Sequence, residues 1–457
     1  MVPRLSCKFF IIHRFSRRMM VNTIPHTSWL FPEEHPEVVS RLLEDKLLKF
    51  DNTRSLPLKS GGTTDVYINL RDARDRPAAI RFITDLFEIP LRRLNVSRFI
   101  EVPDSVSCFA GPLSIATNIP YVTIREQVKT GRVTDAKVIG HTTRGESICI
   151  LDDVITNGAS KVAAYEVCRS RGLLNKALVV LVDRQQGWQK YFADQDITIP
   201  VWAGMTLHDV RRQLIQGLGI MQRCDPKIEK ANPIIVALDG KDWEQILPLI
   251  DPLRTTGCIL KVNDLLFDQG ISHLLPDLSV YGRIMADLKG HDISNTIGNV
   301  CKRLRPHNPW AVTVHGSGGM KMIAEAVKTL EGTSTKVLAV TVLTSIDPKT
   351  CEEIYTRLPR EQVRALAAIA VRGGAHGFVC SPQEASELSS LYPNKLIVTP
   401  GIRSAGVQAD DQERIGTPRG AMDNGSNHLV MGRQILGASD PVAEVKRIIT
   451  EELQLPA

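Results

Sequence analysis

Beyond Asn232 the sequence repeats one pattern, in which a short apolar run rich in β-forming residues precedes a stretch with helical spacing. The apolar runs fall at residues 234–238, 258–262, 280–286, 311–314, 337–343, 377–380, 396–399 and 428–431. Stretches such as 320–330 and 361–370 carry apolar residues at helical intervals between them. Eight strand–helix alternations in about 225 residues predict a closed (β/α)8 TIM barrel, with its active site at the carboxyl ends of the strands.

Polar residues follow most of these runs. They are Asp239, Lys261, Asp287, Lys289, His315, Thr344, Ser345, residues 400–403, Gly432 and Arg433. In a barrel the carboxyl ends of all strands meet at one face, so these side chains are expected to converge. Residues two apart on a strand share a face, so Asp287 and Lys289 should point into the same space. The alternative for this pair alone is a surface ion pair of little energetic weight.

A known family resembles this half of the chain. Asp287-Leu-Lys-Gly-His-Asp292, followed by Ile293-Ser-Asn-Thr296, is similar to the D-x-K-x-x-D signature of orotidine 5′-monophosphate decarboxylases. Further similar segments are IIVALD, CILKV, TVHGSGG, VTVLTSID, VTPGIR, DDQERIGTP and VMGR, spread over nearly all of residues 232–450. The segment after Lys261 departs from the family pattern with Asn263-Asp264, which should alter a rim and not the chemistry. The resemblance implies decarboxylation that needs no cofactor and no metal.

The resemblance also implies roles for individual residues. Four would be catalytic, namely Lys289, Asp287, Asp292 and Lys261. Asp287 would face the leaving carboxylate, and Lys289 would stabilise the charge at C6 and donate the proton. Asp292 would reach the site of a neighbouring subunit, where it would hold the ribose hydroxyls together with Asp239 and Lys261. The carboxylates around Lys289 would keep it protonated. A homodimer or a higher homo-oligomer is therefore expected.

Substrate contacts follow from the same resemblance. They are implied at Asp239, Ile293, Thr296, Thr344, Ser345, Pro400, Gln412 and Arg433. Asp239 would hold ribose hydroxyls, while Thr344 and Ser345 would contact the pyrimidine edge. Gln412 and Arg433 would bind the 5′-phosphate beneath a polar lid at residues 406–417, so that remote binding energy drives closure.

The strongest pattern upstream is Ile148-Cys-Ile-Leu-Asp152-Asp153, followed by a small-residue turn at 156–160. Four apolar residues predict a buried strand, and its carboxyl end is where open α/β sheets bind ligands. The turn leads into a helix from Lys161 onward, whose free N–H groups suit a phosphate. An acidic turn with a serine cap is the structural alternative, but it leaves the paired acids unexplained.

This pattern resembles the phosphoribosyl-pyrophosphate motif of type I phosphoribosyltransferases, and the half as a whole is similar to orotate phosphoribosyltransferases. Supporting segments are Lys59-Ser-Gly and Asp183-Arg184-Gln-Gln-Gly187. The resemblance implies an open parallel sheet that binds orotate and phosphoribosyl pyrophosphate with Mg²⁺. The implied contacts are Lys59, Arg125, Lys129, Asp152, Asp153, Thr156, Asn157, Gly158, Ala159, Ser160 and Arg184.

Two departures leave the activity of the upstream half open. The family's mobile basic segment is represented by residues 125–131, where Glu126 replaces a lysine and the family's histidine is missing; residues 109–120 are also shorter than expected. An anion beside a pyrophosphate adds repulsion.

The first hypothesis is a bifunctional enzyme that makes and then decarboxylates orotidine 5′-monophosphate. The second is a decarboxylase with a degenerate regulatory or oligomerising domain, and a third is a related barrel enzyme acting on sugar phosphates.

Length and composition limit the remaining possibilities. At 457 residues the chain is expected to form two domains. We predict a basic leader at 1–31, a phosphoribosyltransferase-like domain at 32–224 and a decarboxylase barrel at 225–457. The leader is either an organellar transit peptide or an extension ahead of a true start at Met19 or Met20. A net charge of +6 without a basic stripe predicts no nucleic-acid partner, and no apolar run is long enough to predict a membrane span. Nine scattered cysteines favour a cytoplasmic location.

Overall fold

The computed structural model describes residues 26–52, 54–58, 63–125, 137–407 and 415–455. By packing, the chain divides into two compact units, residues Met1–Phe31 with Leu70–Met205, and Pro32–Asn69 with Thr206–Ala457. A division by packing need not follow a division by function, so the domain ranges given above stay a prediction. Among the described helices, none combines the length and the apolar character that a membrane crossing requires.

The first unit is built on a seven-stranded sheet of the described residues in the order β1-β11-β10-β9-β6-β7-β8. Its strands are β1 His26–Ser28, β6 Arg98–Glu101, β7 Tyr121–Ile124, β8 Val138–Ile139, β9 Ser147–Ile155, β10 Leu174–Asp183 and β11 Val201–Thr206. The pairs β1–β11, β6–β7, β6–β9 and β9–β10 are parallel, whereas β8 pairs antiparallel with β7 at the edge. The structure thus confirms the predicted open, mostly parallel sheet.

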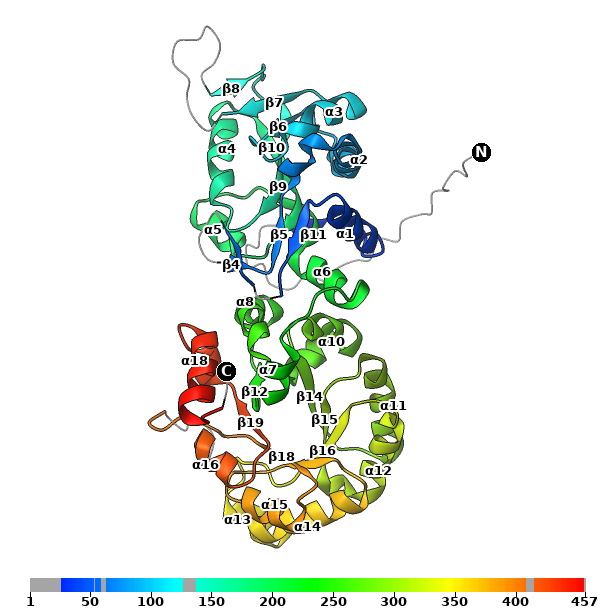
Figure 1. Ribbon diagram of the computed structural model, residues 1–457, viewed down its shortest axis with the longest axis vertical. Helices are drawn as coiled ribbons and strands as arrows, with labels where there is room; N and C mark the ends of the chain where they lie inside the picture. Colours follow the sequence, from blue (N-terminus) through cyan, green and yellow to red (C-terminus); the bar gives the residue numbers. More distant parts are fainter. Residues whose placement is uncertain (1–25, 53, 59–62, 126–136, 408–414, 456–457) are drawn as a thin grey trace, which may run out of the picture. The chain divides into compact units, whose positions relative to one another are not determined.

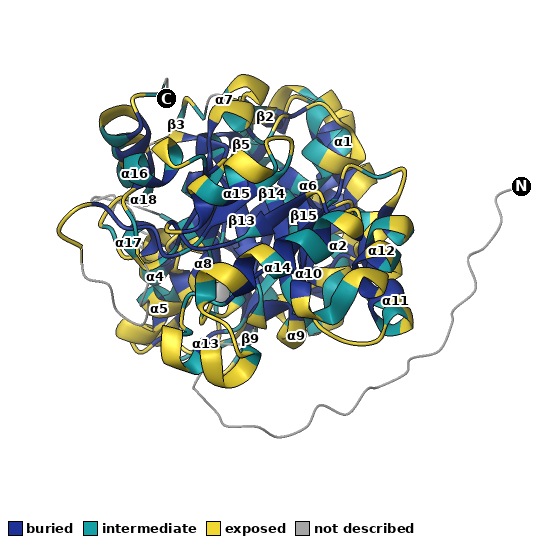
Figure 2. Cartoon of the chain, turned by 90° about the horizontal axis from the view of Figure 1, so that it is seen from below, coloured by how far each residue is buried: buried dark blue, intermediate teal, exposed yellow. Residues whose placement is uncertain are grey.

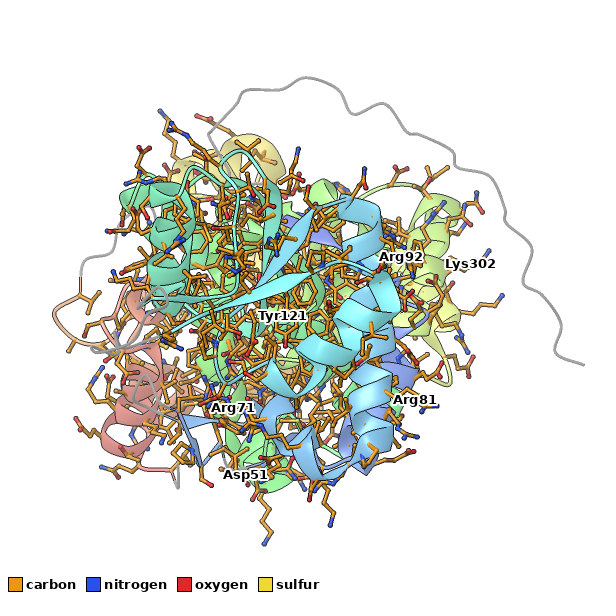
Figure 3. The ribbon with its side chains drawn as sticks, turned by 90° about the horizontal axis from the view of Figure 1, so that it is seen from above. Asp51, Arg71, Arg81, Arg92, Tyr121 and Lys302 are labelled. Atoms are coloured by element: carbon orange, nitrogen blue, oxygen red, sulfur yellow. The ribbon has the colours of Figure 1, made fainter. Side chains whose placement is uncertain are left out.

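Helices cover this sheet. They are α2 Pro77–Leu94, α3 Ser107–Thr117, α4 Ala159–Ser170 and α5 Trp188–Asp194, preceded by the 3-10 helix η1 Leu70–Asp75. The helix α2 buries Ile83, Phe87 and Leu91, which are spaced by four residues and therefore share one face. Arg81 and Arg92 extend from the exposed side of α2, as Figure 3 shows. This amphipathic spacing is why the segment forms a helix against the sheet.

The second unit contains a closed barrel of eight parallel strands, as the repeating pattern predicted. The strands are β12 Ile234–Ala237, β13 Ile259–Val262, β14 Arg283–Gly290, β15 Ala311–His315, β16 Lys336–Val340, β17 Gly377–Val379, β18 Leu396–Thr399 and β19 His428–Met431. The barrel closes where β12 pairs with β19. Its core is filled by apolar residues such as Ile235, Ile259, Met285, Leu338 and Val398. Figure 2 shows the strands buried beneath helices whose outward faces are exposed.

Helices surround the barrel strands (Figure 1). They are α8 Trp243–Leu253, α9 Asp264–Gln269, α10 Ile271–Ser279, α11 Ser294–Leu304, α12 Gly319–Leu330, α13 Pro348–Tyr355, α14 Pro359–Arg372, α15 Ala385–Leu391, α16 Pro418–Asp423, α17 Arg433–Leu436 and α18 Pro441–Arg447. The third barrel strand differs from its prediction, because β14 continues past Ala286 to Gly290. Asp287 and Lys289 therefore belong to the strand and do not follow it.

Segments outside the barrel complete the second unit. They are α1 His35–Glu44, β2 Leu48–Phe50, β3 Leu56–Pro57, β4 Thr63–Thr64, β5 Val66–Ile68, α6 Leu207–Arg212, the π-helical turn η2 Gln213–Gly217 and α7 Pro226–Ala231. The short helix α6 continues without a break into the π-helical turn η2. The strand β2 pairs antiparallel with β5, which begins directly after Asp65.

A buried charge cluster holds these segments against the barrel. Asp65 is fully buried and receives two hydrogen bonds from Arg211, at 2.7 and 2.9 Å, and one from Arg254 at 2.6 Å. Arg211 also pairs with Asp251. Burial acts to raise the pKa of Asp65, but the two guanidinium groups outweigh it and lower the pKa to about 2. Such a bidentate, desolvated arrangement stabilises only as a complete set, because removal of one member leaves a buried charge unpaired.

Candidate active site

A cavity of about 660 Å³ opens at the carboxyl ends of the barrel strands. Eight of the residues predicted for the decarboxylase site line it, namely Asp239, Lys261, Asp287, Lys289, Thr344, Ser345, Pro400 and Arg433. Apolar side chains such as Met285, Val340 and Val430 form the rest of the wall. An apolar cavity with a few convergent charged groups is the usual form of a small-molecule site.

Four charged side chains alternate in sign along one side of this cavity. The ammonium of Lys261 lies 2.6 and 2.9 Å from the two carboxylate oxygens of Asp239 and 3.0 Å from Oδ2 of Asp287. The ammonium of Lys289 lies 2.6 Å from the same oxygen of Asp287. Each lysine contacts at least one carboxylate, and Asp287 contacts both lysines. The arrangement is an Asp–Lys–Asp–Lys chain that runs along the strand ends of β12, β13 and β14.

Lys261 and Asp287, the two inner residues of this charge chain, are kept charged by their neighbours. Burial acts to lower the pKa of Lys261, but Asp287 and Asp239 outweigh it and raise the pKa above its usual value. Burial acts to raise the pKa of Asp287, but Lys261 and Lys289 outweigh it and lower the pKa. The ends of the chain are more accessible, since the side chain of Asp239 is 48% exposed and that of Lys289 33%. These two side chains therefore present the largest exposed surface of the four to a ligand.

Thr313 is a residue that the sequence analysis missed. It is fully buried on β15, donates its hydroxyl to Oδ1 of Asp287 at 2.8 Å and accepts the backbone N–H of Lys289 at 2.8 Å. A signal was available in the sequence, because a lone threonine interrupts the apolar strand Ala311-Val-Thr-Val-His315. A buried hydroxyl needs a partner, and its partner here is the charge chain.

Three predicted residues lie outside the cavity wall. Asp292, Ile293 and Thr296 follow β14 at the start of α11, and none of them lines the cavity. Asp292 is exposed and accepts the backbone N–H of Ile293 at 2.6 Å, while the Ile293 side chain is 70% exposed. None of the three is therefore part of the wall that contains the charge chain in the same polypeptide.

Basic side chains outside the charge chain also line the cavity, and one of them, Arg433, is a predicted phosphate contact. Arg433 begins α17, directly after Gly432, and Arg403 lines the same wall. A Cβ on Gly432 would lie 3.2 Å from both the Cβ and the carbonyl oxygen of Ala237, so this position has little room for a side chain. The backbone N–H of Ser404 donates a hydrogen bond to Oε1 of Gln434 at 3.0 Å, which connects residue 404 to the helix α17. Gln412 lies outside the described residues.

The acids predicted for the upstream site are held inside the sheet of the first unit. The strand β9 runs through to Ile155, so Asp152 and Asp153 are buried strand residues and do not lie beyond its end. Asp152 forms an ion pair with the buried Lys161, which the sequence analysis had used only to mark the start of a helix. Burial raises the pKa of Asp153 to about 7, assisted by the charge of Asp152 and opposed by Lys161.

The predicted phosphate turn lies beside these acids. Thr156, Asn157 and Gly158 lead into α4, which begins at Ala159 and continues through Ser160. Asn157, Ala159 and Ser160 are exposed, and Oδ1 of Asn157 accepts the N–H of Ala159 at 3.2 Å. Gly158 has φ +82°, and a Cβ there would lie 2.5 Å from the Phe192 ring, so only glycine fits. The turn is thus an open helix start with small residues, as a phosphate requires.

The remaining transferase residues are distributed unevenly. Arg184 follows β10, is buried, and donates its backbone N–H to Ile155 at 2.9 Å, which brings it next to the end of β9. Arg125 follows β7 and pairs through its backbone with Lys137. Lys59 and Lys129 lie outside the described residues, as does Glu126. The structure therefore brings together the acids, the turn and Arg184.

Comparison with known proteins identifies the barrel. The model of the orotidine 5′-phosphate decarboxylase / HUMPS family matches residues 232–448. Orotidine 5′-phosphate decarboxylase of Pseudomonas paraeruginosa is 43% identical over 227 residues, covering 48% of this chain and 97% of that protein. A crystal structure of orotidine 5′-phosphate decarboxylase from Lactobacillus acidophilus is 37% identical, with a TM-score of 0.42, and covers 50% of this chain and 100% of that one.

A structure of UMP synthase from Leishmania donovani is 27% identical, with a TM-score of 0.37, and covers 42% of this chain and 41% of that one. The family model matches the barrel half, and the match to the Pseudomonas relative extends over almost the whole of that relative. The chain therefore belongs to the orotidine 5′-phosphate decarboxylase / HUMPS family.

Proposed function

We propose that the barrel decarboxylates orotidine 5′-monophosphate to uridine 5′-monophosphate. The observation that carries the proposal is the Asp239–Lys261–Asp287–Lys289 chain, which lines an otherwise largely apolar cavity beside Thr344 and Ser345. Its alternating charges are held by contacts of 2.6–3.0 Å, so they are oriented before any substrate arrives. Charges fixed in advance stabilise a developing charge without the cost of reorganising solvent.

The reaction breaks the bond between C6 and the carboxylate carbon. The electron pair of the broken bond stays on C6, and carbon dioxide leaves. C6 then takes a proton from the ammonium of Lys289, and the resulting amine regains a proton from solvent. Lys289 suits this role because it contacts Asp287 yet remains one-third exposed to the cavity. Asp287 would lie beside the departing carboxylate, while Lys261 holds Asp287 in place and keeps it ionised.

The other side chains would bind the parts of the substrate that do not react. Asp239 and Lys261 would hold the ribose hydroxyls, and Thr344, Ser345 and Pro400 would contact the pyrimidine. Arg433, together with Arg403 and Gln412, would bind the 5′-phosphate. Phosphate binding far from C6 accelerates the reaction only if its energy assembles the reacting end.

We further propose a homodimer with shared sites. The exposure of Asp292 and Ile293, directly after the strand that carries Lys289, supports a role in a neighbouring subunit. Thr296 would enter the same partner site from the first turn of α11. In such a dimer each cavity would combine Lys289 of one chain with Asp292 of the other.

For the upstream half we propose orotate phosphoribosyl transfer, so that the chain would carry out two consecutive steps of UMP synthesis. The open turn 156–160, Asp153 and Arg184 support this proposal, because they lie together at the ends of β9 and β10. Among the described residues, no group of three or more acidic, histidine or cysteine side chains could hold a metal ion. Mg²⁺ would therefore arrive on the pyrophosphate, with Asp153 as a protein carboxylate near it, which suits the ion's preference for phosphate oxygens and water.

A specific observation favours a second candidate for the upstream half. Asp152 is fully buried and its carboxylate is paired with Lys161, so one of the two acids implied for ribose binding has an internal partner. A domain of this kind that no longer transfers could still bind a nucleotide through the turn and regulate or oligomerise the enzyme. Activity measurements distinguish the two candidates.

Two assays on the purified full-length chain test these proposals. Orotidine 5′-monophosphate alone should yield UMP and carbon dioxide, and failure to do so at any substrate concentration would overturn the barrel assignment. The transferase is best tested in the Lys289→Ala chain with orotate, phosphoribosyl pyrophosphate and Mg²⁺, because the product then accumulates. Absence of orotidine 5′-monophosphate there, with nucleotide binding retained, would favour the regulatory domain.

A further inference from the structure

The strand β14, which carries Asp287 and Lys289, is irregular at its carboxyl end. β14 pairs with β15 in regular register as far as Ala286 opposite Val312, and pairing resumes with Gly290 opposite Val314. Three residues of β14, 287 to 289, therefore face the single residue Thr313. A bulge of this kind changes the direction of side chains and is common beside active sites.

Lys289 takes a strained backbone conformation within this bulge. Its φ of +47° lies in the left-handed region, which a residue with a Cβ adopts only when its surroundings require it. In a regular strand the side chains of Lys289 and Asp287 would project from the same face. Here the direct contact between these two side chains depends on the shape of the bulge. Something must therefore hold the bulge in this shape.

Thr313 makes the contacts that hold it. Its hydroxyl oxygen accepts the backbone N–H of Lys289 at 2.8 Å, so its single proton is free for Oδ1 of Asp287, also at 2.8 Å. The other oxygen of Asp287 is the one that Lys261 and Lys289 contact. One fully buried hydroxyl thus connects the backbone of one proposed catalytic residue to the carboxylate of another.

We propose that Thr313 is a positioning residue for decarboxylation, whose hydroxyl sets the distance between the Asp287 carboxylate and the Lys289 ammonium. The proposal rests on the decarboxylase function proposed above. Valine has the same shape but lacks the hydroxyl, so it would leave the Lys289 N–H and an Asp287 oxygen without their present partner. Serine would keep the hydroxyl with a freer side-chain torsion, because it lacks the methyl group that restricts threonine.

Thr341 provides a matched control. It is buried in the same barrel, directly after β16, and donates its hydroxyl only to the carbonyl oxygen of Val379 at 2.9 Å. It does not line the cavity. Thr341→Val makes the same chemical change as Thr313→Val and removes one buried hydrogen bond, but it leaves the charge chain intact.

The test compares the parent, Thr313→Val, Thr313→Ser and Thr341→Val as full-length chains with orotidine 5′-monophosphate. We expect Thr313→Val to lower kcat by about 30-fold or more with KM changed less than about threefold, since only the reacting end is disturbed. Thr313→Ser should recover kcat to within about fivefold of the parent, and Thr341→Val should stay within about threefold. UMP, the product, should bind Thr313→Val as tightly as the parent.

A pH profile separates positioning from a merely structural role. The hydrogen bond from Thr313 is one of the contacts that lower the pKa of Asp287, after the larger effects of Lys261 and Lys289. Its loss should therefore shift the acidic limb of kcat/KM to higher pH in Thr313→Val and leave it unchanged in Thr341→Val. If Thr313→Val does not fold, Thr313→Cys, with similar volume and a weaker donor, should give an intermediate loss and the same direction of shift.

Each outcome decides the proposal. The role of Thr313 alone is overturned if the parent decarboxylates and Thr313→Val keeps kcat within threefold of the parent with an unshifted pH profile. Thr313→Cys takes the place of Thr313→Val in this comparison if the latter does not fold. Equal losses in the variants of Thr313 and Thr341 would do the same, because they would reflect stability only. An inactive parent would overturn the decarboxylase function, and the role of Thr313 with it.

Discussion

The ammonium of Lys289 lies 2.6 Å from Oδ2 of Asp287, two residues earlier on the same strand. Lys261 contacts that oxygen as well, at 3.0 Å. The carboxylate is thus buried between two cations, which keep it ionised where an isolated buried acid would take up a proton. A ligand that enters the cavity meets a lysine that this contact already holds in place.

Lys289→Ala should abolish decarboxylation. Loss of the general acid alone is worth roughly 10²–10⁴ in rate, and the stabilisation of charge at C6 is lost with it. Steady-state measurement of UMP formation checks this, with Lys349→Ala as the control because Lys349 is 87% exposed and forms only a surface ion pair. Residual activity within tenfold of the parent would contradict the assignment of Lys289.

Mixing Lys289→Ala and Asp292→Ala chains should restore decarboxylation that neither chain has alone. If Lys289 acts in its own cavity and Asp292 in the partner's, one of the two sites in a mixed dimer contains both native residues. The measurement is UMP formation after verified exchange of subunits, for example with two affinity tags. Exchange without returned activity would rule out the shared site.

Asp65→Ala should destabilise the unit that contains the barrel by roughly 3–5 kcal/mol, the usual cost of breaking a buried ion pair. Arg211 and Arg254 would stay buried beside the vacated position. Urea unfolding followed by loss of decarboxylase activity measures the effect. Glu353→Ala, which breaks an exposed pair with Lys349, should change stability by less than about 1 kcal/mol. A similarly small change for Asp65→Ala would show that the cluster contributes no net stability.

The contribution of Asp65 should depend on pH in one direction. Its pKa is lowered from 3.8 to about 2 on folding, so the stabilisation is complete above the unfolded value and is lost as pH falls through the folded one. The difference in unfolding free energy between the parent and Asp65→Ala should thus be constant from pH 5 to 8, within about 0.5 kcal/mol. It should shrink between about pH 4 and pH 2. A difference that grew on acidification would contradict the lowered pKa.

Phosphoribosyl transfer, if present, should rise with pH through about 7. The pKa of Asp153 is raised to about 7 by burial and by Asp152, so its carboxylate gains charge in this range and binds ribose hydroxyls or Mg²⁺ better. Transfer measured in the Lys289→Ala chain from pH 6 to 8 tests this. Asp153→Asn should be nearly inactive and its residual rate flat with pH, whereas a parental profile that falls with pH would exclude ionised Asp153 as the required form.

The sequence alone was sufficient for the fold of each half. Apolar runs such as 234–238 and 396–399 are local patterns, and a chain with eight of them alternating with amphipathic helices has few ways to bury them other than a closed barrel. The convergence of Asp239, Lys261 and Asp287 at one face follows from strand direction, which the alternation dictates. In the structure all three of these residues line one cavity, as predicted.

The precise contacts were decided by tertiary structure. Period-two spacing places Asp287 and Lys289 on one face, but a bulge held by Thr313 brings their charges together, and no local pattern specifies which residue of a neighbouring strand lies opposite. Lys161 pairs with Asp152 from nine residues away, and Asp65 meets Arg254 across 189 residues. Such pairings depend on register and on the packing of distant segments, whose energies arise only when the chain has folded and water has been excluded.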